Sequence, residues 1–147
     1  MKRLLITLAV GAILAPSLPA AAVNWLREGQ TGQAVRAISA GSRASYTFTA
    51  TGQSPTLRLN ESCSTAQFQL VATSATVQPY ICSKESSASG FAYATDCGRL
   101  QATNLETGIF GEVDVTEADP WVIDIPYRLV LVDVTAGTGT LWIECRP

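Results

Sequence analysis

The chain has 147 residues, of which 47% are hydrophobic and 15% are charged, with a formal net charge of −2 and no histidine. Without histidine the commonest general base and the commonest zinc ligand are missing, so the familiar serine and cysteine hydrolase designs are excluded. The sequence also has no run of basic residues, and nucleic acid is not an expected partner, because phosphate binding depends on clustered Lys and Arg.

The amino-terminal residues predict export. Lys2 and Arg3 precede an apolar run over residues 4–14, and a stretch of small residues ends at Ala22. This order of charged, apolar and small segments is typical of a secretory signal peptide, and the apolar run is shorter than the roughly 20 residues that a membrane span needs. We therefore expect cleavage after Ala22, with residues 1–22 removed.

The expected mature chain, residues 23–147, is predicted to be a single domain, secreted or periplasmic, with no transmembrane segment. A chain of this size removes roughly two thirds of its unfolded surface from water, which is enough for one core. Loss of the two leader cations makes its formal charge more negative by two.

Four cysteines lie in the mature chain, at Cys63, Cys82, Cys97 and Cys145. An even number in an exported protein predicts two disulfides, each of which stabilises a fold by about 2–4 kcal/mol. Of the three possible pairings we favour Cys63 with Cys82, which closes a local loop, and Cys97 with Cys145, which ties the last strand to the middle of the chain. A zinc site is the lesser alternative, because no C-x-x-C spacing is present.

Alternating polar and apolar residues predict the first clear strands. Residues 45–51 and 56–60 both show the period of two that is typical of half-buried strands, and residues 52–55 between them contain turn-forming types. We expect these two strands to pair as a hairpin. The residues expected to face inward are Tyr46, Phe48 and Ala50 in the first strand and Leu57 and Leu59 in the second.

In the middle of the chain, residues 66–73 are predicted to form a strand with Phe68, Leu70 and Ala72 on its inner face. A second extended piece, 76–82, contains Pro79 and is predicted to be an edge strand. Residues further along are less regular. We expect a mobile polar loop at 83–90 and weaker strands at 91–95, 99–105 and 109–116.

The carboxy-terminal part is predicted to contain the central strand and a final hairpin. Strands are expected at 121–125 and at 127–134, and the second is apolar on both faces, as in a strand covered on both sides. A glycine-containing loop at 135–139 would then turn the chain into the last strand, 140–145. About eight short strands with no helical period favour an all-β, antiparallel, jelly-roll-like β-sandwich stapled by disulfides.

The segments SYTFTAT (45–51), YRLVLV (127–132) and GTGTLWI (137–143) resemble the bacterial prepeptidase carboxy-terminal domain, over roughly the last hundred residues. That family is a jelly-roll β-sandwich that follows secreted hydrolases. The resemblance implies an accessory role in secretion, folding or substrate attachment, without catalytic residues. The chain departs from the family in its four cysteines and in standing without an enzyme.

A cluster of acidic residues is the candidate metal site. Glu112, Asp114, Glu117 and Asp119 are close in sequence, and clustered carboxylates suit a hard cation such as calcium, although the spacing is not that of an EF-hand. On a strand, however, Glu112 and Asp114 share one face, and the favoured interpretation is a solvated strand and loop without a cofactor. Two carboxylates of this set or of Asp124 within about 10 Å of each other in a compact pocket would favour an enzyme instead.

The three tryptophans are the candidate binding residues. Trp142 alternates with Leu141 and Ile143, which predicts that its indole lies on the less buried side of the last strand. Trp121 and Trp25 are candidates to join it in an aromatic platform. The favoured alternative is that each indole packs under a loop or at a sheet rim, because large aromatic side chains are usually mostly buried.

These observations favour a non-catalytic exported module that binds a protein or glycan at the cell envelope. The alternative is a structural subunit of an extracellular assembly, in which residues 23–33 pair with the sheet of a neighbouring molecule and the chain forms a homo-oligomer. An enzyme that uses only carboxylates or a lone serine is the third class.

Overall fold

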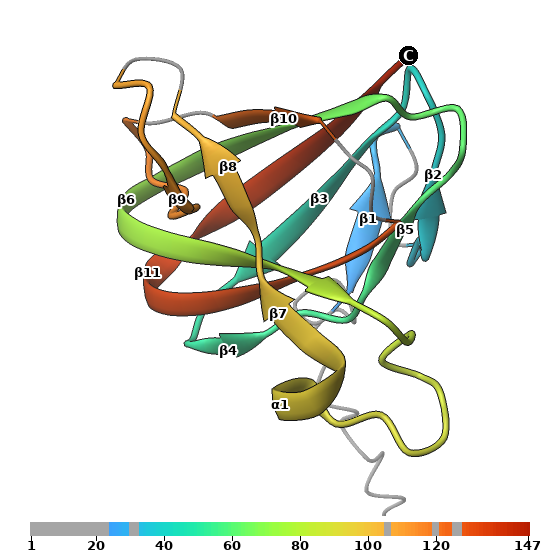
Figure 1. The fold of residues 1–147 in the computed structure, drawn as a ribbon. Helices are drawn as coiled ribbons and strands as arrows, with labels where there is room; N and C mark the ends of the chain where they lie inside the picture. The colour runs from blue at the N-terminus through green and yellow to red at the C-terminus, as the bar shows by residue number, and fades with distance from the viewer. Residues whose placement is uncertain (1–23, 30–32, 105–106, 119–120, 125–127) are drawn as a thin grey trace, which may run out of the picture.

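The computed structural model describes residues 24–29, 33–104, 107–118, 121–124 and 128–147. The expected signal peptide lies outside these residues. Within them the fold is all-β, as predicted, and the one helix is the single turn α1 (Tyr93–Asp96), which replaces the strand expected at 91–95 (Figure 1). None of the described residues belongs to a helix long and apolar enough to span a membrane.

Two strands of 18 residues form the spine of the fold. They are β6 (Thr65–Cys82) and β11 (Leu129–Arg146), which pair antiparallel along nearly their whole length and curve together around the molecule (Figure 1). The prediction of many short strands was therefore wrong in one respect, because each of these long strands replaces two expected ones.

The curvature comes from a bulged segment in β11. The register with β6 shifts between Val134 and Ala136 and again between Ala136 and Thr138. Gly137 has a φ of +79°, and a Cβ atom there would lie 2.7 Å from the Cα of Ala75. Because a bulge bends a strand without ending it, the expected loop at 135–139 and the terminal hairpin are both wrong.

The two halves of the spine belong to two layers of one nearly closed sheet, compatible with the predicted sandwich. The first layer contains β1 (Trp25–Arg27), β3 (Arg43–Phe48), the second half of β11, the first half of β6 and β10 (Trp121–Asp124). The second layer contains β2 (Ala37–Ile38), β5 (Leu57–Leu59), the remaining halves of β11 and β6, and β7 (Cys97–Arg99). The short β4 (Gly52–Gln53) pairs with β11 at the bend. Among the strands that the structure describes, only β2 and β5 pair in parallel.

A separate hairpin follows the second layer. It consists of β8 (Gln101–Thr103) and β9 (Phe110–Glu112), which pair only with each other in the described part of the chain. The backbone of Leu100, between β7 and β8, joins the hairpin to the main sheet by donating to Pro79 at 2.9 Å and accepting from Val113 at 3.0 Å. The residues after β9 contact the spine as well, because the backbones of Val77 and Val115 exchange hydrogen bonds of 3.0 and 2.8 Å.

The inward faces of the two layers form one core. As predicted, Tyr46, Phe48, Leu57 and Leu59 are buried, whereas Ala50 lies beyond the end of β3 and is exposed. The apolar start of β11 is covered on both sides, again as predicted. Val130 and Val132 belong to the main core, and Leu129 and Leu131 belong to a smaller cluster with Cys82.

The expected hairpin between the first two strands does not form. The strands β3 and β5 lie on opposite layers, and each pairs with a different half of β11. The edge position predicted from Pro79 is also wrong, since β6 has β11 on one side and β7 on the other. The proline is tolerated because its nitrogen, which has no hydrogen to donate, points to the side where pairing with β7 ends. Its carbonyl points to the same side and accepts a hydrogen bond from Leu100.

Two disulfides form, as predicted, but their pairing differs from the one that we favoured. Cys63 bonds to Cys145, and Cys82 bonds to Cys97. The first bridge follows from the spine, because the start of β6 lies beside the end of β11 and Ala66 pairs with Cys145. The second joins directly opposed residues of β6 and β7. The prediction was wrong because strand pairing, which the spacing of the cysteines does not reveal, decides which of them meet.

Candidate functional site

The three tryptophans do not form a platform, because strand register places them in different environments. Trp25 is opposite Tyr46 on the inner face of the first layer, and it is only 1% exposed. Its indole nitrogen donates a hydrogen bond to the Pro55 carbonyl at 2.8 Å. Trp25 is therefore a core residue, as the alternative interpretation held.

Trp142 lies on the outer face of the first layer, as alternation predicted. It is half-buried and stands opposite Ser45 on one side and Gln69 on the other. The guanidinium of Arg43 lies 4.2 Å from the centre of its ring, and Glu28 holds that guanidinium at 3.2 Å. A cation packed on the indole already occupies one surface of the ring, which fits a structural role.

Trp121 begins β10 opposite Phe68 and is partly buried against the main core. Its indole nitrogen donates to the Asp114 carbonyl at 3.1 Å, so the ring is tied to the chain that follows the β8–β9 hairpin. This tryptophan, unlike the other two, lies beside the predicted acidic residues.

Arg99 organises two of the acidic residues. Its guanidinium lies 3.2 Å from a Glu112 oxygen and 3.0 Å from an Asp114 oxygen, and it also donates to the Val113 carbonyl at 3.0 Å. The Arg99 side chain is 17% exposed, whereas both carboxylates are about half exposed, as the shared solvent face predicted. A largely buried cation thus holds two accessible anions in fixed positions.

Glu117 points elsewhere. Its carboxylate accepts a hydrogen bond from the Ala75 backbone N–H at 2.9 Å, and this bond lowers the pKa of Glu117 from its ordinary value. Asp119 lies outside the described residues. The described residues contain no group of three or more His, Cys, Asp or Glu side chains that could hold a metal ion, and the calcium site stays a prediction.

A shallow cleft beside the hairpin brings together the predicted residues Glu112, Asp114 and Trp121. Its volume is about 320 Å³. We call this surface, together with the adjoining Phe110, the hairpin cleft. The residues that line it are Asn104, Thr107, Ile109, Gly111, Glu112, Asp114 and Trp121.

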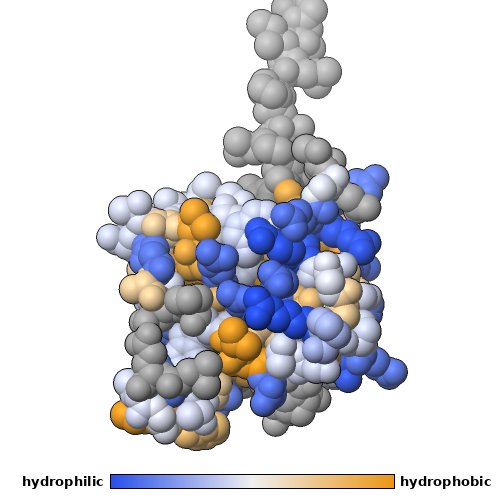
Figure 2. Space-filling model, turned by 90° about the horizontal axis from the view of Figure 1, so that it is seen from above, coloured by the Kyte–Doolittle hydropathy of each residue, from blue (hydrophilic) through white to orange (hydrophobic). Residues whose placement is uncertain are grey.

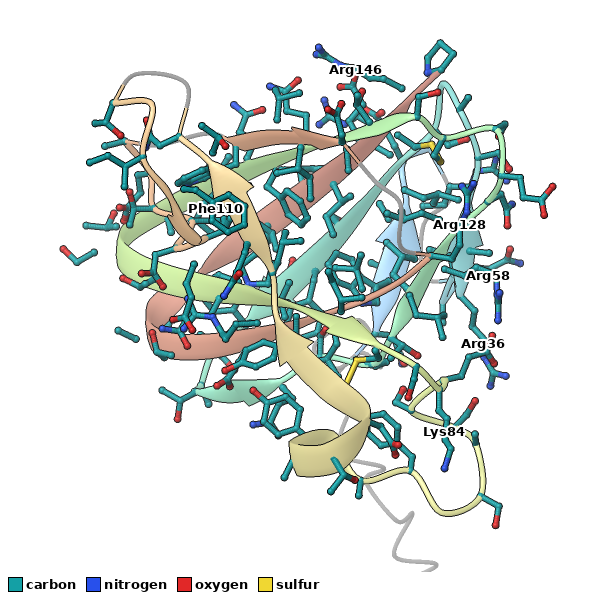
Figure 3. The ribbon with its side chains drawn as sticks, in the orientation of Figure 1. Arg36, Arg58, Lys84, Phe110, Arg128 and Arg146 are labelled. Carbon is teal, nitrogen blue, oxygen red and sulfur yellow. A yellow bond between two sulfur atoms is a disulfide. The ribbon has the colours of Figure 1, made fainter. Side chains whose placement is uncertain are left out.

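Sequence reasoning missed the two most exposed large apolar residues of the described chain. Ile109 is 68% exposed and Phe110 is 64% exposed, at the start of β9. A signal was available, because neighbouring residues of a strand point to opposite faces and two adjacent large apolar residues cannot both turn inward. The exposed pair borders the cleft, and Figure 3 shows Phe110 beside β8 at the side of the molecule.

The carboxylates of Glu112 and Asp114 lie close together in the hairpin cleft. Glu112 and Asp114 share one guanidinium, so they satisfy the distance expected of a carboxylate pair. General acid–base catalysis, however, needs one carboxyl group that is protonated and one that is ionised. In the cleft, one cation faces both groups, and both side chains are about half exposed.

Hydrophilic side chains dominate the face seen from above, with separate apolar patches beside them (Figure 2). Ile109 and Phe110 are the most exposed large apolar side chains of the described residues, and the carboxylates held by Arg99 lie near them. Comparison of the chain with protein-family profiles, with curated proteins and with solved structures finds no match.

Proposed function

We propose that this protein is a non-catalytic binding module of the periplasm or the exterior, and that it binds a protein partner through the hairpin cleft. The single observation that carries the proposal is the exposure of Ile109 and Phe110 beside the carboxylates of Glu112 and Asp114. Export is supported by the leader-like amino terminus and by two disulfides, which persist in oxidising compartments.

The apolar pair supplies the driving force for such a contact. Full burial of one large apolar side chain contributes about 1.5–3 kcal/mol. Ile109 and Phe110 are adjacent on a hairpin outside the main sheet, so a partner can cover both without disturbing the core.

The charges determine what kind of partner fits. Glu112 and Asp114 outnumber the single cation between them, and their positions are held by Arg99. Fixed anions beside an apolar surface complement an apolar side chain that is flanked by Lys or Arg. A protein segment offers this combination, whereas a neutral glycan offers neither a large apolar side chain nor a cation.

Selection of displayed random peptides on the mature protein tests the proposal. We expect enrichment of sequences in which an aromatic or branched aliphatic residue stands beside Lys or Arg. Binding of the selected peptides should be lost in the double variant I109S/F110S and weakened in E112Q/D114N.

Two matched variants serve as controls. Val71 is 58% exposed on the outer face of the first layer, and V71S removes apolar surface away from the cleft. W142A removes the tryptophan of that same face. Both should bind the selected peptides as the wild type does. Equal binding by I109S/F110S, or capture of a neutral glycan by the cleft with no peptide enriched, would contradict the proposal.

A further inference from the structure

A second and larger cavity lies away from the hairpin cleft. Its volume is about 430 Å³, and it is formed by the amino-terminal segment, the start of β5 and the loop after β6. We call it the Arg36 pocket. Among its lining residues are Ala34, Val35, Arg36, Pro55, Thr56 and Glu85.

The walls of the Arg36 pocket are fixed by hydrogen bonds. Ser86 binds the backbone and side chain of Thr56 through contacts of 2.9–3.3 Å, and Glu85 accepts from Arg58 at 2.7 Å. The loop at 83–90, which we expected to be mobile, is thus tied to β5. A cavity with tied walls is a preformed site.

Several basic residues lie at this side of the molecule. Figure 3 shows Arg36, Arg58, Lys84 and Arg128 at the right-hand side of the molecule and Phe110 in its left half. Arg58 is paired with Glu85, and Lys84 lies 3.8 Å from Asp96. Within the described chain, Arg36 has no ion pair and no side-chain hydrogen bond, so its charge is available at the rim of the pocket.

We propose that the protein partner of the hairpin cleft is a second copy of this chain, whose Arg36 pocket receives Ile109 and Phe110. This inference rests on the proposed function and names its partner. The carboxylates of Glu112 and Asp114 then meet the guanidinium of Arg36, which has no ion pair among the described residues. The apolar pair enters between Ala34, Val35 and Pro55.

Size and charge both agree with this contact. We call Ile109 and Phe110, together with the neighbouring Glu112 and Asp114, the tip. A cavity of about 150 Å³ suffices for a benzene ring, so a pocket of 430 Å³ has room for both apolar side chains of the tip. The tip carries anions and the pocket carries a free cation, and opposite charges at the two surfaces fix the orientation of the contact.

The positions of the two surfaces determine the form of the assembly. Because tip and pocket lie on different sides of the molecule (Figure 3), one copy can use its tip on a second copy while its own pocket receives a third. Such head-to-tail contacts form open chains or rings rather than closed two-fold dimers. The earlier alternative was pairing through residues 23–33. Within them, β1 pairs with β3 of its own sheet on one edge and lies at the end of the strand order, so this alternative stays a prediction.

Sedimentation velocity of the mature protein over a concentration series tests the inference. Wild type and V71S should form species larger than a dimer at high concentration, and these should dissociate as salt is raised, since charge contacts are screened. The variants F110D and R36E should each remain monomeric.

A mixture of the two variants gives the decisive result. F110D has an intact pocket, and R36E has an intact tip, so one productive contact remains possible between them. The mixture should therefore contain dimers and nothing larger. Peptide binding through the cleft with monomeric wild type at every concentration would refute self-assembly while leaving the proposed function standing. A mixture that stays monomeric, or F110D that still associates, would also overturn the inference.

Discussion

The two disulfides close opposite ends of the spine, and they support different parts of the molecule. Cys63–Cys145 joins residues 82 apart in sequence and lies in the main core, where both cysteines are buried. Cys82–Cys97 joins residues 15 apart and belongs to the smaller cluster beside α1. The first bridge joins the residues just before β6 to the end of β11, at one end of the spine. The second anchors β7, which continues into the hairpin that carries the cleft.

The largest expected effect is loss of the first bridge. Closing a loop of 82 residues restricts the unfolded chain by about 4–5 kcal/mol, so C63S/C145S should lower the free energy of unfolding by about that amount. Urea denaturation followed by tryptophan fluorescence measures the change. Mass mapping of nonreduced peptides provides the control, and a bridge between Cys63 and Cys82 would contradict the fold.

Loss of the second bridge tests whether the two disulfides support different parts of the molecule. The shorter loop predicts a smaller stability change for C82S/C97S, about 3 kcal/mol. Because β7 leads into the hairpin, this variant should also weaken binding of the selected peptides while still folded, whereas C63S/C145S should not. Peptide titrations on folded samples of both variants measure this difference. Equal binding by the two would show that the bridge at β7 does not support the cleft.

A substitution that overpacks the bend of the spine should have an intermediate effect on stability. A Cβ atom at Gly139 would lie 2.8 Å from the Val71 carbonyl and would also meet the Ala72 side chain. G139A should therefore destabilise the fold by about 1–3 kcal/mol, the usual cost of overpacking. Gly98 has no heavy atom within 4 Å of such a Cβ, which makes G98A the matched control in thermal unfolding. Equal stability of the two variants would mean that β6 and β11 do not approach closely at the bend.

The sequence could predict what depends on neighbouring residues but not what depends on pairing. Alternation identified the inward faces of β3 and β5, because the period of two is local. It could not show that these strands pair with different halves of β11, nor that Cys63 reaches Cys145. Gly137 was read as a turn residue because a positive φ serves a turn and a bulge equally well.

The candidate site was predictable to a similar extent. Residue type singled out Trp121, Glu112 and Asp114, and the structure brings them together. Residue type could not show which of Trp121, Trp25 and Trp142 lies beside the acidic residues, because their positions follow from strand register. The exposed pair at the tip and the free charge of Arg36 depend on contacts between distant segments, which a local pattern does not contain.

The smallest expected effect concerns Glu117, which reaches across to Ala75 at the bend. Its pKa in the folded protein lies below its ordinary value of 4.5, mainly because the Ala75 N–H stabilises the ionised form. The stability from this bond is thus present above the ordinary pKa and disappears as pH falls through the lowered pKa. We expect E117Q to be slightly less stable than wild type at about pH 7, with the difference shrinking below about pH 4. Thermal unfolding of both proteins across this range measures it. A difference that is constant down to the lowest pH would show that the carboxylate charge does not contribute, and that the contact at the bend acts through packing alone.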